Sequence, residues 1–197
     1  MAEGRRRRAV LAGHEGNEAA ARHLLAGGDG PVRAAALGAL GRMGAATADD
    51  VGRGLEDPDP VVRRRACQVA VGVDGVAAEE LGARLGDHDP AVAEVAAWAL
   101  GERGRPCAGS VVQALAAMAT GHEDALCREA AVAALGAIGD AAGLAAVLAA
   151  TRDRPAVRRR AVIALAAFEG PEVDAALRRA LEDRDWQVRQ AAEDLLA

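Results

Sequence analysis

Aromatic residues are almost absent from this chain of 197 residues, which has two tryptophans, one phenylalanine and no tyrosine. Lysine is absent as well, so all 24 basic side chains are arginines. The three cysteines, Cys67, Cys107 and Cys127, lack CxxC spacing, so we expect reduced thiols in a cytoplasmic protein. No run of about 18 apolar residues occurs, and no long apolar stretch follows the basic start. Neither a membrane span nor a secretory signal is therefore predicted.

Alanine is the residue in excess: it supplies 52 of the 197 residues, about half of the hydrophobic total of 51%. This apolar content excludes a wholly disordered chain. Arginine without lysine suits phosphate binding, but excess alanine, glycine and arginine is also typical of a GC-rich, bacterial-type coding sequence, the interpretation we favour. The formal net charge is −5, whereas nucleic-acid-binding domains are usually basic. Nucleic acid is therefore a disfavoured partner.

A motif of about 30 residues recurs six times along the chain. Each copy has an apolar anchor, an alanine four positions later and, in five of the six copies, a leucine eight positions later. These three positions share one face of an α-helix. The pattern therefore predicts a helix in each copy, and its small residue should let a neighbouring helix approach closely. The anchors are Val32, Val62, Val92, Cys127, Val157 and Val188.

Start and stop signals flank these predicted helices. An aspartate three residues before the anchor can cap free N–H groups, and proline follows it in the first turn of several copies. Two glycines near the far end of three helices indicate where they stop. The capping residues are Asp29, Asp59, Asp89, Asp124 and Asp185, and the glycine pairs are Gly41/Gly44, Gly101/Gly104 and Gly136/Gly139.

A second predicted helix precedes each anchor, with leucine seven residues upstream in four copies and leucine or valine eleven residues upstream in three of these. A pair of helices this short cannot bury its apolar face alone, but stacked pairs can, as in a solenoid. The sequence therefore predicts an all-α fold, a right-handed α-α superhelix of about six helix pairs. We expect residues 1–8, which are basic, to be frayed and residues 9–197 to form a single repeat domain.

The repeated strings resemble HEAT-like repeats of the short phycobilisome-lyase type. The clearest are Asp57-Pro-Asp-Pro-Val-Val-Arg-Arg-Arg-Ala and Glu129-Ala-Ala-Val-Ala-Ala-Leu-Gly-Ala-Ile-Gly-Asp. The resemblance covers residues 17–197 and is specific for fold rather than function. It implies a curved solenoid whose second helices line a concave groove and bind partners there. The family label also implies a lyase-type activity, and bacterial alkylpurine DNA glycosylases, which use similar solenoids, imply DNA binding or repair.

Aspartate three residues before the anchor and arginine one residue after it recur together. In the family such residues are expected to form ladders between adjacent repeats, so we assign them to structure. The predicted ladder consists of Asp29 with Arg33, Asp59 with Arg63, Asp124 with Arg128 and Asp185 with Arg189.

Positions two, three and six after the anchor should face the groove, because they lie away from the apolar stripe. Trp98 is either exposed there, where tryptophan and arginine often dominate binding, or folded into space between alanines. Trp186 either caps the end of the stack or marks an exposed contact. The predicted binding residues are Arg64, Arg65, Gln68, Glu94, Trp98, Glu129, Arg159 and Arg160.

No catalytic constellation accompanies the groove. Ser110 is the only serine, and fold alone licenses no activity. His14-Glu15 and His122-Glu123 resemble the iron-binding pairs of deoxyhypusine hydroxylase, but they lie near the N-terminus and in a predicted turn, so no metal or cofactor is expected. Our leading hypothesis is a non-enzymatic adaptor that binds an acidic or helical segment of another protein. We expect a monomer or a weak end-to-end oligomer; the alternatives are the DNA and lyase functions above.

Overall fold

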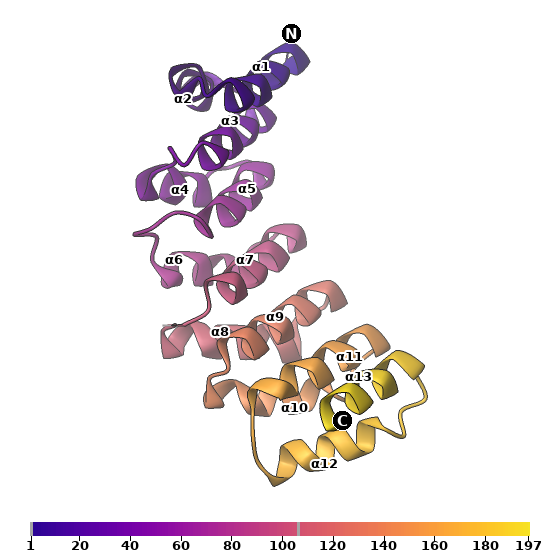
Figure 1. Ribbon diagram of the computed structural model, residues 1–197. Coiled ribbons are helices and arrows are strands. Elements are labelled where there is room, and N and C mark those ends of the chain that lie inside the picture. Colours follow the sequence, from indigo (N-terminus) through magenta and orange to yellow (C-terminus); the bar gives the residue numbers. More distant parts are fainter. Residues whose placement is uncertain (1, 106) are drawn as a thin grey trace. The chain divides into compact units, whose positions relative to one another are not determined.

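The computed structural model describes residues 2–105 and 107–197, and every regular element in these two ranges is helical (Figure 1). The chain forms two compact units, one up to Ala99 and one from Leu100, and the division falls within α7. The first unit contains α1 (Ala2–Glu15), α2 (Glu18–Gly27), α3 (Gly30–Arg42), α4 (Ala48–Leu55), α5 (Pro60–Ala70), α6 (Ala78–Gly82), the 3-10 turn η1 (Ala83–Gly86) and most of α7 (Pro90–Arg103).

The second unit continues the same alternation of helices. It contains α8 (Gly109–Gly121), α9 (Ala125–Ile138), η2 (Ala141–Gly143), α10 (Leu144–Ala150), α11 (Pro155–Ala164), η3 (Leu165–Ala167), α12 (Pro171–Ala180) and α13 (Trp186–Leu196). The elements α2 to α13 form six pairs, and each predicted anchor lies in the second helix of its pair. The all-α solenoid of helix pairs is thus confirmed.

An additional helix, α1, precedes the six pairs and packs on α3. Residues 2–8, which we expected to be frayed, belong to this helix, and Met1 lies outside the described residues. The expectation of one repeat domain over residues 9–197 stays a prediction.

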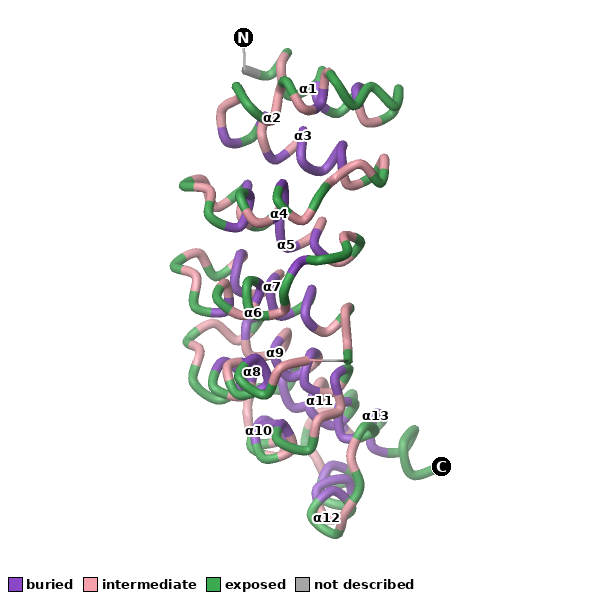
Figure 2. Tube along the Cα trace, turned by 90° about the vertical axis from the view of Figure 1, so that its left-hand side faces the viewer, coloured by how far each residue is buried: buried purple, intermediate pink, exposed green. Residues whose placement is uncertain are grey.

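The core follows the predicted stripe. The six alanines four residues after the anchors are all fully buried, as are the anchors or nearly so. In α5 the buried Ala66 lies against Gly54 of α4, where a Cβ added to the glycine would come within 2.9 Å of the Ala66 Cβ. The small residue therefore lets the two helices of a pair approach closely. Figure 2 shows the buried segments (purple) along second helices such as α3 and α9.

The predicted caps form as expected. Asp29 accepts a hydrogen bond from the Val32 N–H at 3.1 Å, and Asp124 accepts one from the Leu126 N–H at 2.8 Å. The other three predicted capping aspartates each accept an N–H from the residue two positions on. These bonds satisfy donors that the first turn of a helix leaves free.

The glycine pairs have two different roles, and only one was predicted. Gly44, Gly104 and Gly139 have φ between 61° and 67° and follow the ends of α3, α7 and α9. The first glycine of each pair lies inside its helix instead. A Cβ on Gly101 would come within 3.0 Å of the Ala134 Cα, and one on Gly136 within 2.9 Å of the Ala164 Cα. These glycines therefore lie where neighbouring second helices approach closely, and they are not stop signals.

None of the described helices is long and apolar enough to cross a membrane.

Candidate functional site

Arginines one residue after four of the anchors form an ion-pair ladder between repeats. In the first unit, Arg63 donates from Nε to Asp87 Oδ2 at 2.7 Å and from Nη2 to Asp87 Oδ1 at 2.8 Å. Its Nη1 donates to the carbonyl oxygens of Asp57 and Pro58. This planar, two-bond geometry is the strong form of an arginine–carboxylate pair. The same arrangement joins Arg33 to Asp57, Arg128 to Asp153 and Arg158 to Asp183.

The aspartate half of the predicted ladder was wrong. Asp29, Asp59, Asp124 and Asp185 cap their own helices, because the free N–H groups of the first turn lie within reach of so short a side chain. The longer arginine side chain reaches the turn of the next repeat, where the aspartate four or five residues before the anchor receives it. The predicted ladder pair of Arg189 was wrong as well. Within the described chain Arg189 has no carboxylate partner, and it donates to the Asp183 carbonyl oxygen at 2.7 Å.

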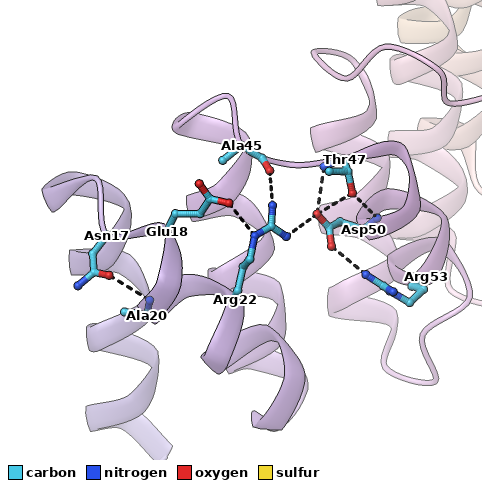
Figure 3. A network of polar contacts seen from close by, with 8 residues as sticks. All are labelled: Asn17, Glu18, Ala20, Arg22, Ala45, Thr47, Asp50 and Arg53. Carbon is cyan, nitrogen blue, oxygen red and sulfur yellow. Dashed lines mark hydrogen bonds and ion pairs between the residues drawn. The ribbon is translucent and has the colours of Figure 1, made fainter.

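A second polar network ties α2 to α4 (Figure 3). Asp50 is buried and accepts hydrogen bonds from Thr47 N at 3.0 Å and Thr47 Oγ1 at 2.9 Å. Its carboxylate also pairs with Arg22 and Arg53. Burial alone would raise the pKa of Asp50, but the hydrogen bonds from Thr47 and Arg22 outweigh it and lower the pKa. A cavity of about 520 Å³ adjoins this network, yet its arginines Arg22, Arg33 and Arg53 all have carboxylate partners.

A different cavity, of about 480 Å³, brings together three of the predicted binding residues: Arg65, Gln68 and Trp98. Trp98 is 43% exposed, so it lies on the surface rather than within the alanine core. Gly38 and Gly41 of α3 also line this cavity. A pocket of this size suits a side chain or small group of side chains from a ligand.

Arg42 is a further lining residue of this cavity that the sequence analysis missed. It lies ten residues after the anchor Val32, outside the positions that we assigned to the groove. Within residues 2–105 and 107–197, the guanidinium groups of Arg42 and Arg65 form no hydrogen bond or ion pair with protein groups. We call the cavity, with Gly38, Arg42, Arg65, Gln68 and Trp98, the Arg42–Arg65 pocket.

The remaining predicted groove residues are distributed between the two units. In the first unit, Arg64 is exposed and Glu94 is half-buried, and neither lines the Arg42–Arg65 pocket. In the second unit, Arg160 Nη2 lies 3.5 Å from Glu129 Oε1, so these two predicted binding residues compensate one another. Arg159 is half-buried there. A part in binding for these four residues stays a prediction.

Comparison with known families and structures decides the class of the chain. The family described as HEAT repeats matches residues 78–155, and the PBS lyase HEAT-like repeat matches residues 157–183. This chain is a HEAT-repeat protein.

Solved structures agree with this fold. The X-ray structure of YibA from Escherichia coli is similar to the HEAT-repeat chain with a TM-score of 0.73 and 15% identity, over 94% of this chain and 69% of that one. A designed armadillo repeat protein has a TM-score of 0.63 and 16% identity, over 89% and 97%. Another, in complex with the peptide (KR)4, has a TM-score of 0.59 and 16% identity, over 99% and 98%. No curated protein matches the sequence.

The HEAT-repeat protein has few groups suited to metal or thiol chemistry in its described part. No cluster of three or more His, Cys, Asp or Glu side chains suited to a metal ion occurs in residues 2–105 and 107–197. Cys67 and Cys127 are buried and Cys107 is half-buried. Burial raises the pKa of Cys67 to about 12, so this thiol is protonated at neutral pH and is a poor nucleophile.

The HEAT ladder should make the protein sensitive to acid. The hydrogen bond from Arg63 is the main cause that lowers the pKa of Asp87, and Asp153 and Asp183 likewise have lowered pKa values because of Arg128 and Arg158. A lowered native pKa stabilises the fold above the ordinary aspartate pKa of about 4, and the stability is lost as pH falls through the native pKa. We expect the urea concentration at the midpoint of unfolding, measured by circular dichroism, to decrease as the pH is lowered below about 4.

A matched variant separates the ladder from general acid effects. Asp87→Ala lacks one of these carboxylates, so its unfolding free energy should fall less than that of the wild type between pH 5 and pH 3. Equal losses in the two proteins would show that the ladder does not cause the acid sensitivity.

Proposed function

We propose that this HEAT-repeat protein is a non-enzymatic scaffold or adaptor that binds an acidic segment of another protein on the face formed by its second helices. One observation carries the proposal: α3, α5 and α7 gather exposed Trp98, Gln68 and two arginines without carboxylate partners around one pocket. Every lining residue with charge is positive. Such a surface has an apolar anchor and a positive charge that an acidic ligand can neutralise.

The fold class supports a protein segment as the ligand. A designed armadillo repeat protein with a similar fold is in complex with the peptide (KR)4, so a helical-repeat solenoid can bind a peptide. That peptide is basic, whereas the pocket in the HEAT-repeat protein is cationic, so charge complementarity favours an acidic segment here. Duplex DNA is less favoured, because useful affinity for DNA needs several phosphate contacts.

The two tryptophans of the chain provide a test with an internal control. We expect Trp98→Ala to abolish capture of a stoichiometric partner from the host, without loss of helicity, because it removes the apolar anchor. Trp186 is 64% exposed and begins α13, so Trp186→Ala should capture the partner as the wild type does. Mass spectrometry of proteins retained by the three baits is the measurement.

Two results would contradict this function. Equal retention of the partner by wild type and Trp98→Ala would show that the second-helix face of the first unit takes no part in the interaction. Retention of nucleic acid, with an affinity that falls steeply as salt rises, would favour the DNA alternative.

A further inference from the structure

We infer that the Arg42–Arg65 pocket receives a glutamate or aspartate side chain of the bound segment, while an apolar side chain two positions away in that segment lies on Trp98. This inference rests on the proposed function and specifies the chemistry of the partner. It follows from the charges of the pocket, the packing of Arg65 against α3, and the exposed indole beside them.

The charge argument begins with a contrast between two sets of arginines. Arg33, Arg63, Arg128 and Arg158 each place two nitrogens on one carboxylate of the next repeat. The cavity beside α2 and α4 is likewise balanced by Asp50 and Asp57. Among the residues that the structure describes, none of those lining the Arg42–Arg65 pocket is acidic. Its positive charge is therefore available to a ligand.

The Arg65 side chain packs against a glycine of α3. A Cβ on Gly38 would lie 3.1 Å from both Cδ and Nε of Arg65, so the side chain lies directly across this glycine. Burial is the main cause that lowers the pKa of Arg65, and the nearby positive charges of Arg42 and Arg64 lower it further. A partly desolvated cation beside like charges gains more from a carboxylate than a fully hydrated one does. Arg65 is therefore the main contact that we expect for the acid.

The geometry of an extended peptide joins the two contacts. Residues i and i+2 of a strand point to the same side and lie roughly 6.5–7 Å apart. An acid at position i can then occupy the arginine end of the pocket while an apolar residue at i+2 covers the indole of Trp98. Arg65 and Trp98 line a single cavity of about 480 Å³, so we expect one short segment to contact both.

Defined peptides test the inference directly. The probe is an octapeptide with blocked ends. Its odd positions alternate between glutamate and leucine, and its even positions are serine. The control peptide has glutamine in place of each glutamate. In a Trp186→Phe background, Trp98 is the only tryptophan and reports binding by its fluorescence. We expect the glutamate peptide to bind at least tenfold more tightly than the glutamine peptide, the range of charge-assisted hydrogen bonds.

Variants of the protein then assign the contact. Arg65→Gln should remove most of this tenfold preference, and Arg65→Lys should retain part of it, because the charge remains without the two-pronged geometry. Arg178→Gln, at an exposed position of α12 in the second unit, is the matched control and should keep the full preference. Circular dichroism and urea unfolding check that each variant is folded.

The outcomes separate this inference from the function on which it rests. Equal binding of both peptides, an unchanged preference in Arg65→Gln, or no binding of the glutamate peptide at millimolar concentration would each overturn the carboxylate site. The adaptor function would still stand if Trp98-dependent capture of a partner persisted. Binding of a 20-base-pair duplex in preference to the glutamate peptide, with loss in Arg65→Gln, would overturn the choice of a protein ligand.

Discussion

Asp87→Ala should lower the free energy of unfolding by about 3 kcal/mol, the low end of the cost of breaking a buried ion pair from one side. The Asp87 side chain is only 4% exposed, and its partner Arg63 is largely buried as well. The substitution removes both bonds from Arg63 and the one from the Asp89 N–H at 3.0 Å. It leaves the Arg63 guanidinium in a partly desolvated site, where backbone carbonyl oxygens are its remaining hydrogen-bond acceptors. Urea unfolding at pH 7 measures the loss.

An exposed pair on α4 is the matched control. Asp49 pairs with Arg53 at 2.8 Å, but its side chain is 75% exposed, and exposed pairs contribute less than about 1 kcal/mol. Asp49→Ala should therefore cost far less than Asp87→Ala. The double variant Arg63→Met/Asp87→Ala should recover part of the loss, because it leaves no unpaired charge. Equal losses of unfolding free energy in Asp49→Ala and Asp87→Ala would mean that burial does not decide how much an ion pair stabilises this protein.

Leu135→Ala should destabilise the second unit by about 3 kcal/mol, as expected for a leucine truncated in a packed core. Leu135 is 1% exposed on α9. Its Cδ2 would lie 2.9 Å from a Cβ on Gly143, so the side chain fills the contact with the following turn. Alanine would leave a cavity that the short helices cannot close completely. The measurement is the midpoint and slope of urea unfolding.

Leu126 on the same helix is the control for this substitution. It is 58% exposed, so Leu126→Ala should change the unfolding free energy by no more than about 0.5 kcal/mol. A loss at Leu126 as large as that at Leu135 would contradict the assignment of the apolar stripe to the core. A small loss at both positions would show that the second unit contributes little to the unfolding transition.

Part of the candidate site was predictable from position in the repeat. Arg65, Gln68 and Trp98 lie three or six residues after their anchors, and the structure places them in one pocket. Arg42 was missed because it follows the anchor by ten residues, almost three helical turns later, where the groove pattern was not applied. The compensation of Arg160 by Glu129 was also missed, because these residues belong to different repeats, and their distance depends on how the repeats stack.

The helix pairs, their caps and the buried stripe were determined by the sequence alone. Each depends on atoms within a few residues of one another: an aspartate reaches N–H groups in its own first turn, and a stripe follows the helical period. The tertiary structure decided the ladder partners, because Arg33 meets an aspartate 24 residues away and not the nearer Asp29. It also decided that Gly101 and Gly136 lie where neighbouring second helices approach closely, rather than at helix ends. Those outcomes depend on the spacing between stacked repeats, which no single repeat encodes.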